Sequence, residues 1–242
     1  MGIYLERYGS GKKMLFVHGA GGSSVSWYFQ KRLEAAGEVI FLDLPGHGRS
    51  AGEGFRTIDG YVESVRTAIR ENGLEGCYVA GHSMGGAIAI SLALSSPEIL
   101  GGLVLVATGA RLKVFPQILE GLLKDKEGTV RSIIDFAFSK NAPRPLIEAG
   151  FAEMMEVPKE VIHGDFSACD RLDLIGRVKE IELPTLVICG SDDVLTPPGY
   201  SEYLAGAIRG SKLVLIPHAG HMVMIENAEE TNRALEGFLS HR

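Results

Sequence analysis

Residues 79–86 have the sequence VAGHSMGG, and this stretch decides how the rest of the chain is interpreted. Ser83 has one glycine two positions before it and another two positions after it, and it stands between an apolar run at 77–80 and an alanine-rich run at 87–95. This pattern predicts a strand that turns abruptly into a helix at the serine, whose side chain is then strained and exposed. The free N–H groups and positive dipole end of that helix would favour a developing anion.

The Gly-x-Ser-x-Gly pattern is a weak signal by itself, because a chain of 242 residues with 31 glycines produces it readily by chance. Its value depends on the elements around it. Six short runs are apolar on both faces, which is typical of a parallel sheet covered by helices on each side. These runs are residues 14–17, 39–42, 77–80, 103–106, 186–189 and 213–216.

Helical patterns alternate with these runs, and this alternation predicts an α/β fold with a mostly parallel, doubly wound sheet. The helical patterns cover residues 58–72, 85–96, 198–208 and 229–239. Residues 3–8, which lead through the glycine-rich segment 9–11 into the first apolar run, predict instead an antiparallel hairpin at the sheet edge.

From about residue 109 to residue 176 the strand-like runs stop, and the sequence is helical in pattern with four prolines. We therefore predict a helical cap (lid) insertion over residues 109–176, within a core formed by residues 1–108 and 177–242. Aromatic residues at helical spacing often pack a core, so only part of the insertion's large apolar set is expected to line a substrate pocket. The pocket candidates are Phe115, Phe136, Phe138, Phe151 and Met154.

Composition excludes several classes of partner. The net charge of −6 and the lack of a basic stripe argue against nucleic acid. The chain has no metal-ligand spacing such as Cys-x-x-Cys, and we expect neither a metal nor a cofactor. Residues 1–8 do not resemble a signal peptide and no uncharged apolar stretch reaches 18 residues, so we expect a cytoplasmic protein without membrane insertion. The choice between a monomer and a homodimer stays open.

Polar and glycine-rich segments directly follow the apolar runs, at the strand ends where open α/β sheets bind ligands. A serine hydroxyl needs a base to become a nucleophile, and the base needs an anionic partner that fixes its tautomer. Asp192 and Asp193 compete for the acid, and His218 and His221 compete for the base. The segments are 18–22 (HGAGG), 43–50 (DLPGHGRS), the Ser83 turn, 190–193 (GSDD) and 217–221 (PHAGH).

Taken together, these segments resemble the α/β-hydrolase superfamily, and more narrowly its small carboxylesterases and lipase-like serine hydrolases. The resemblance runs from about residue 14 to the end of the chain and implies the α/β-hydrolase fold. The family order is serine, acid, histidine. It implies a triad of Ser83, Asp193 and His221, with Asp192 as a capping or surface residue and His218 as a solvent-facing residue at a strand end.

The resemblance also implies an oxyanion hole formed by the backbone N–H groups of Ala20 and Met84. The other histidines near these motifs are expected to have structural roles. His18 would hold its own loop by hydrogen bonding, and His47 would buttress the loop in which it lies. His82 would point away from the nucleophile, because side chains alternate along a strand, and would serve in packing.

The implied function is a serine hydrolase that cleaves short- to medium-chain acyl esters through an acyl-enzyme on Ser83, so the expected partner is a small-molecule acyl ester. Other activities of the superfamily use the same triad, because selectivity depends on the shape of the cap. They are an acyl-CoA thioesterase, a C–C bond hydrolase, an amidase and an acyltransferase or perhydrolase. A ligand receptor on the same fold is a less favoured alternative.

Overall fold

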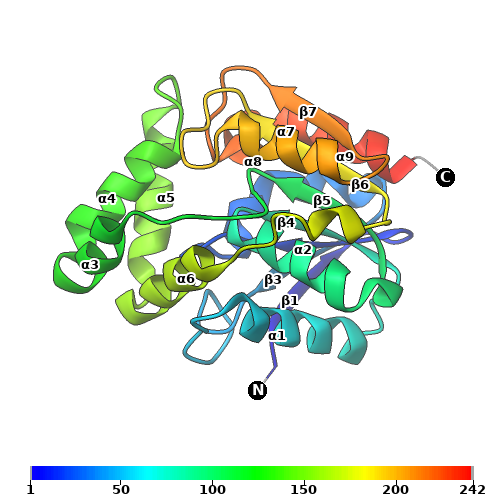
Figure 1. Cartoon of the computed structure of the whole chain (residues 1–242), viewed down its shortest axis with the longest axis horizontal. Coiled ribbons are helices and arrows are strands. Elements are labelled where there is room, and N and C mark those ends of the chain that lie inside the picture. Colours follow the sequence, from blue (N-terminus) through cyan, green and yellow to red (C-terminus); the bar gives the residue numbers. More distant parts are fainter. Residues whose placement is uncertain (1, 241–242) are drawn as a thin grey trace.

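The computed structural model describes residues 2–240, so residue 1 and residues 241–242 of the two predicted core segments lie outside it. Its strands form a single sheet in the order β1-β3-β2-β4-β5-β6-β7 (Figure 1). All neighbouring pairs are parallel except β1 with β3. The predicted α/β fold with a mostly parallel sheet is thereby confirmed. The strands are β1 (Tyr4–Tyr8), β2 (Lys13–Val17), β3 (Glu38–Asp43), β4 (Cys77–His82), β5 (Leu100–Val106), β6 (Thr185–Gly190) and β7 (Lys212–Ile216).

The predicted hairpin between residues 3–8 and 14–17 is wrong in its pairing. β1 lies antiparallel to β3, with Tyr4 opposite Asp43, and β3 separates it from β2. Neighbouring strands lie about 4.8 Å apart, so the four residues 9–12 are long enough to carry the chain past one strand. A short glycine-rich connection therefore does not specify a hairpin when a third strand can enter between its arms.

Helices cover both faces of the sheet, and the four helical patterns read from the sequence are found with ends shifted by a residue or two. The segment η1, which has 3-10 geometry, was not predicted. Its buried residues Trp27 and Leu33 do not repeat with an α-helical period, and it is anchored by the Ser23 hydroxyl, which accepts from Val25 N–H. These elements are η1 (Ser24–Ala35), α1 (Ile58–Glu71), α2 (Met84–Ser95), η2 (Pro97–Ile99), η3 (Val178–Glu180), α7 (Pro198–Ala207), α8 (Val223–Glu226) and α9 (Ala228–Ser240).

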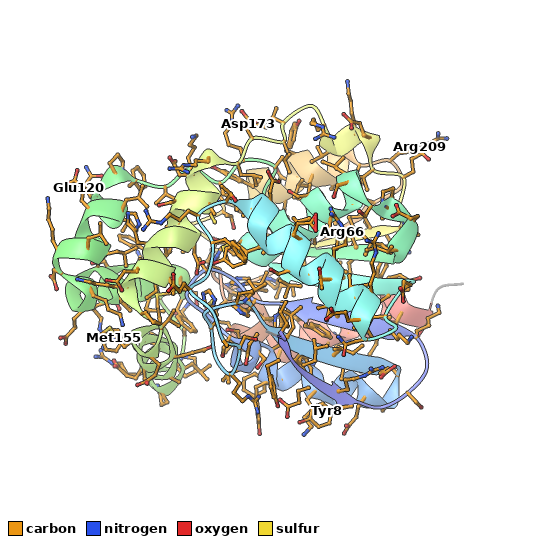
Figure 2. All side chains as sticks on the ribbon, turned by 90° about the horizontal axis from the view of Figure 1, so that it is seen from below. Tyr8, Arg66, Glu120, Met155, Asp173 and Arg209 are labelled. Carbon is orange, nitrogen blue, oxygen red and sulfur yellow. The ribbon has the colours of Figure 1, made fainter. Side chains whose placement is uncertain are left out.

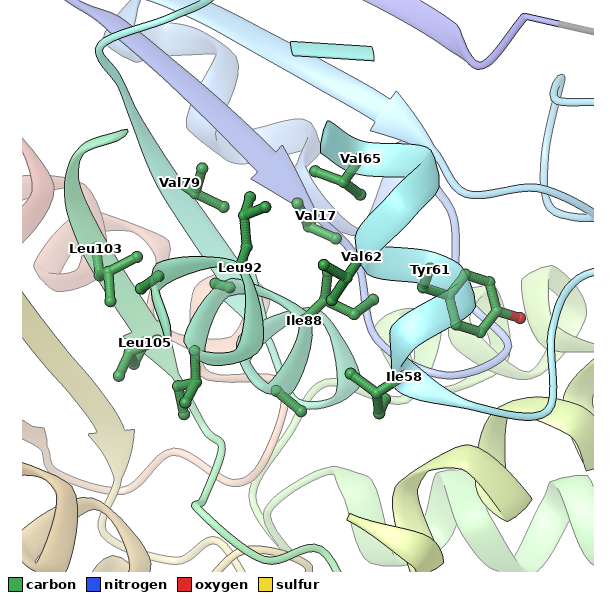
Figure 3. Packing of buried hydrophobic residues seen from close by; sticks show 14 of the residues in the cluster. Val17, Ile58, Tyr61, Val62, Val65, Val79, Ile88, Leu92, Leu103 and Leu105 are labelled. Carbon is green, nitrogen blue, oxygen red and sulfur yellow. The ribbon is translucent and has the colours of Figure 1, made fainter. Parts of the chain in front are cut away.

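Side chains alternate along each strand between two apolar layers. In β2, Leu15 and Val17 pack with residues of α1 and α2, whereas Met14 and Phe16 pack with residues of η1 and α9. Figure 3 shows the first layer, in which side chains of β2, β4 and β5 meet Ile88 of α2 and its neighbours. Because both faces are covered, the strands are apolar throughout, which explains the continuous runs in the sequence.

Four further helices lie between β5 and β6 and gather at one end of the sheet (Figure 1). They are α3 (Pro116–Lys124), α4 (Lys126–Ala137), α5 (Arg144–Glu156) and α6 (Lys159–Arg171), and together they are called the four-helix segment below.

The two connections of the four-helix segment run side by side at its base. Arg111 and Asp173 form an isolated antiparallel bridge, and Leu174 N–H donates to the Ala110 carbonyl at 2.7 Å. In Figure 2, Asp173 marks this base, and Glu120 of α3 lies on the opposite side of the molecule from Arg209. The segment thus leaves the core and returns to it at one place, beside the carboxyl ends of the strands.

Candidate active site

Ser83 occupies the turn between β4 and α2 with φ 52° and ψ −115°. This positive φ is a sparsely populated conformation for a residue with a side chain and costs on the order of 1–3 kcal/mol. Four hydrogen bonds hold it in place. Ser83 N–H donates to the Val106 carbonyl at 2.9 Å. The Ser83 carbonyl accepts from Thr108 Oγ1 at 2.7 Å and from the N–H groups of Gly86 and Ala87 at 2.9 and 3.2 Å. The strained turn predicted at Ser83 is therefore present, and its backbone is pinned to the end of β5.

The two glycines of the motif are required by close packing of backbone. A Cβ at Gly81 would lie 2.2 Å from the Gly85 carbonyl oxygen, and a Cβ at Gly85 would lie 2.3 Å from the Val17 carbonyl oxygen. Both distances are far below van der Waals contact, and backbone cannot move aside as a flexible side chain can. The start of α2 can approach the end of β2 this closely only because neither position carries a side chain.

The structure brings Asp193 and His221 together from the loops after β6 and β7. His221 Nδ1 lies 2.9 Å from Asp193 Oδ2, and both side chains are nearly fully buried. Asp192, the competing acid, is exposed and accepts from Ser191 Oγ at 2.8 Å. His218, the competing base, is also exposed, and it lies in the turn after β7.

Asp193 is held as an ionised acceptor. Oδ1 accepts from the N–H groups of Leu195 and Thr196, each at 2.9 Å, and Oδ2 accepts from Thr196 Oγ1 at 2.8 Å as well as from His221. Burial alone would raise the pKa of Asp193, but the His221 ring and the Thr196 donors outweigh burial and hold the pKa below its ordinary value. His221 therefore carries its proton on Nδ1, which leaves Nε2 free to accept one.

Ser83 and His221 line a common cavity of about 1120 Å³ between the strand ends and the four-helix segment. Ala20 lines the same cavity. Met84 is the first residue of α2, where a backbone N–H has no partner within the helix. Within residues 2–240, neither the Ala20 nor the Met84 N–H donates to another protein group. Ala20 and Met84 thus each have an unused N–H donor, and an oxyanion hole needs two such donors.

Four of the five residues predicted to line a pocket do line this cavity. Phe138 and Met154 are buried, whereas Phe115 and Phe136 are 78% and 59% exposed. The prediction is wrong for Phe151, which does not line the cavity. Its ring instead lies 3.7 Å from the Arg131 guanidinium, because this side of α5 faces α4. Helical spacing could not tell which side of α5 faces the strand ends.

His82 is buried, as expected of a packing residue, but the prediction that it points away from the site is wrong. Its ring lines the cavity with a centroid 4.7 Å from that of His221, and its Nε2–H donates to the His221 carbonyl at 3.1 Å. Burial, together with the neighbouring His221, lowers the pKa of His82 to about 3, so the ring is neutral. Strand alternation failed here because the chain turns sharply at Ser83, the next residue.

His18 and His47 have the loop-holding contacts expected of them. His18 Nδ1 lies 2.8 Å from the Gly19 carbonyl, and its Nε2 accepts from Leu44 N–H at 3.0 Å, so it joins the loops after β2 and β3. Burial, followed by the charge of His47, lowers the pKa of His18 to about 4. His47 Nδ1 lies 3.1 Å from the Pro45 carbonyl within its own loop.

Sequence reasoning missed three polar residues at the site. Glu153 of α5 lines the cavity and accepts from Ser23 Oγ at 2.7 Å, and burial raises the pKa of its carboxyl. Asp165 of α6 is fully buried against the loop after β2. Thr196 binds Asp193, and its position three residues after that aspartate is a local signal that could have identified it. The two carboxylates carry no such signal, since their partners are over 100 residues away.

Two other features of residues 2–240 bear on the site. The described part of the chain contains no cluster of three or more histidine, cysteine, aspartate or glutamate residues placed to hold a metal ion. Among the helices described, none combines the length and apolar character needed to cross a membrane.

Comparison with known proteins places this geometry among relatives. A family model described as the alpha/beta hydrolase family matches residues 14–234. A solved structure described as a thermophilic esterase is similar at 39% identity, with a TM-score of 0.85 and 98% of each chain covered. The pimeloyl-[acyl-carrier protein] methyl ester esterase of Nitrosomonas europaea is 26% identical over 94% of this chain and 96% of its own length.

A longer relative is similar over only part of its length. The dihydrolipoyllysine-residue acetyltransferase component of the acetoin cleaving system of Pseudomonas putida is 29% identical over 95% of this chain. The chain spans 64% of the length of that relative.

Proposed function

We propose, from the premise that the chain belongs to the alpha/beta hydrolase family, that it is a serine esterase acting through an acyl-enzyme on Ser83. The observation that carries the proposal is the 2.9 Å contact between His221 Nδ1 and Asp193 Oδ2, beside a cavity that Ser83 also lines. The contact leaves His221 Nε2 free to act as a base, and His221 lines the cavity. A histidine oriented by a carboxylate in this way acts as the general base that activates a serine hydroxyl lining the same cavity.

The reaction begins when His221 Nε2 takes the Ser83 proton as Oγ attacks the ester carbonyl. The tetrahedral oxygen becomes negative and accepts hydrogen bonds from the N–H groups of Ala20 and Met84. The imidazolium, stabilised by Asp193, then gives its proton to the leaving alcohol. Water, activated by the same histidine, cleaves the acyl-enzyme and restores the serine. Each oxyanion donor is expected to contribute about 10²- to 10³-fold to kcat.

The cavity suits apolar esters of short to medium chain length. Its walls include Phe138, Met154 and Phe166, and among the described residues no buried lysine or arginine lines it to bind an anionic head group. A volume of about 1120 Å³ exceeds what an acetyl group fills, so longer acyl chains are expected to gain binding energy of about 0.8 kcal/mol for each CH₂ they bury.

The test uses the Ser83→Ala variant. It should abolish hydrolysis of p-nitrophenyl butyrate and labelling by a fluorophosphonate, with unchanged circular dichroism. Ser132→Ala, which removes an exposed hydroxyl on α4, is the matched control and should behave as the wild type. Retained turnover in Ser83→Ala would contradict the proposal. Measuring kcat/KM for ester, thioester and diketone substrates in parallel then distinguishes an esterase from a thioesterase or C–C bond hydrolase.

A further inference from the structure

A fully buried carboxylate in the four-helix segment contacts the loop that contributes an oxyanion donor. Asp165 of α6 has an exposure of 0%. Its Oδ2 accepts from Gly21 N–H at 2.9 Å and lies 2.8 Å from His47 Nε2, and its Oδ1 accepts from the Tyr61 hydroxyl. These three partners come from the loop after β2, the loop after β3, and α1. Asp165 therefore ties α6 to three separate parts of the core.

The contacts of His47 show that this group is a charged pair. Pro45 O faces Nδ1 at 3.1 Å and Asp165 Oδ2 faces Nε2, so both ring nitrogens meet acceptors and only the imidazolium can donate to both. Burial opposes the charge, but Asp165 outweighs burial and raises the pKa of His47. Nearby His18 is neutral, because its Nε2 accepts from Leu44 N–H. The positive charge beside Asp165 is thus located on His47.

The Gly21 contact bears directly on the proposed oxyanion hole. Gly22 N–H donates to the Gly19 carbonyl at 3.2 Å, so residues 19–22 form a tight turn with Ala20 and Gly21 at its centre, and Gly21 has φ +65°. The Ala20 N–H has no protein partner that would orient it within residues 2–240. Two side chains anchor this turn: His18 Nδ1 lies 2.8 Å from the Gly19 carbonyl, and Asp165 Oδ2 accepts from the neighbouring Gly21 N–H. The peptide plane that carries the Gly21 N–H adjoins, at Ala20, the plane that carries the Ala20 N–H, so holding the first restricts the direction of the second.

We propose that Asp165 is a positioning residue for the oxyanion hole: by binding Gly21 N–H, it holds the Ala20 N–H toward the reacting carbonyl. This inference rests on the proposed esterase function. Met154 of α5 supports it, because its side chain packs on Gly21, where a Cβ would lie 3.0 Å from Met154 Cε. The four-helix segment thus reaches the oxyanion turn from two helices, and the turn acquires its catalytic geometry only with that segment in place.

A purely structural role for Asp165 makes a different prediction, and Tyr61 separates the two. Tyr61→Phe removes one donor from the same buried group but leaves the contact between Asp165 Oδ2 and Gly21 intact. If the group only stabilises the fold, Asp165→Ala and Tyr61→Phe should both lower stability, and their effects on kcat should be the same. If Asp165 positions the turn, only its own truncation should lower kcat.

The experiment measures kcat and KM for p-nitrophenyl butyrate, and Ki for an alkyl trifluoromethyl ketone, which forms the oxyanion on the enzyme. Asp165→Ala should lower kcat about 10- to 100-fold and change KM by less than about threefold, as expected for a displaced transition-state donor. Its Ki should rise by the same factor as kcat/KM falls. Asp165→Asn keeps an oxygen for Gly21 N–H and should recover most of the lost kcat.

Asp173→Asn is the matched control, since it removes the exposed Arg111 contact at the base of the four-helix segment without touching residues 19–22, and it should retain wild-type kinetics. If Asp165→Ala does not fold, Asp165→Ser replaces it, because its hydroxyl stays polar but is one atom shorter. The inference would be overturned if Asp165→Ala (or Asp165→Ser) had the kcat of wild type. It would also be overturned if Tyr61→Phe lowered kcat by as much as that variant does. A wild type that neither hydrolyses esters nor reacts with the ketone would instead overturn the proposed function.

Discussion

Replacing Asp193 with asparagine should nearly abolish turnover without unfolding the protein, and the reason lies in how Asp193 is held. Oδ1 accepts from two backbone N–H groups, of Leu195 and Thr196, at 2.9 Å each. In Asp193→Asn the side-chain oxygen must keep that position, because an amide NH₂ there would face two donors. The NH₂ group is therefore placed where Oδ2 meets His221 Nδ1.

An NH₂ group at that position donates to His221 Nδ1, so Nδ1 must become an acceptor and the ring proton moves to Nε2. His221 can then no longer accept the Ser83 proton. In serine hydrolases with a Ser-His-Asp triad, replacing the aspartate by asparagine lowers kcat about 10⁴-fold. This corresponds to about 5.5 kcal/mol of transition-state stabilisation. Because the geometry at Asp193 forces the same wrong tautomer, we expect a loss of this size here.

The assay is initial-rate hydrolysis of p-nitrophenyl butyrate, with the tautomer of His221 followed by ¹⁵N NMR of labelled protein. Thr196→Val is the matched control. It removes Thr196 Oγ1, which donates to Oδ2 and lies 3.1 Å from His221 Nδ1, but it leaves the contact between His221 and Asp193. It should cost about 10- to 150-fold, as for one hydrogen bond to a charged group, and so far less than Asp193→Asn. An Asp193→Asn enzyme within tenfold of wild type, or one whose His221 keeps its proton on Nδ1, would refute the reasoning.

Three further predictions concern the fold and its pH dependence. Gly85→Ala places a Cβ 2.3 Å from the Val17 carbonyl oxygen and should lower both activity and thermal stability; a fully active, equally stable variant would argue against this close approach. Leu103→Ala empties a fully buried site in β5 and should lower the free energy of unfolding by about 2–5 kcal/mol in urea titrations, whereas a change below 1 kcal/mol would mean that the layer repacks. Burial opposes the His47 charge, but Asp165 outweighs it and raises the pKa, so this pair stabilises the fold fully below about pH 6.5 and less as pH rises through the folded-state pKa. As the pH rises from about 6.5 through the folded-state pKa, the melting temperature of wild type should therefore fall more than that of His47→Gln. If the melting temperatures of the two proteins changed with pH in parallel, the pair would be excluded as the cause.

Local patterns accounted for the elements that the sequence predicted well. A strand buried on both faces must be apolar along its whole length, so the runs at 14–17 and 103–106 could be recognised without knowledge of their neighbours. The turn at Ser83 was predictable for the same reason, because Gly81 and Gly85 are required by contacts within a few residues or with the adjoining strand. The chain order of Ser83, Asp193 and His221 then named residues that the strand ends would bring near one another.

Contacts between distant segments were not predictable, because no local pattern records them. β1 pairs with β3 since an intervening strand can enter between the arms of an apparent hairpin. Phe151 faces away from the cavity because packing of α5 against α4, not helical spacing, sets which side of α5 is covered. Asp165 meets Gly21 across 144 residues, and in the sequence it is one more acidic residue in a helical pattern.

The sequence by itself therefore determined the order of the core strands along the chain, the helices α1, α2, α7 and α9 between and after them, and the residue types at the strand ends. These depend on hydrophobic period and turn chemistry over a few residues. Only the tertiary structure decided which carboxylates are buried, and against which donors. That choice depends on the docking of the four-helix segment on the strand ends, where Glu153 and Asp165 exchange water for partners that lie far away along the chain.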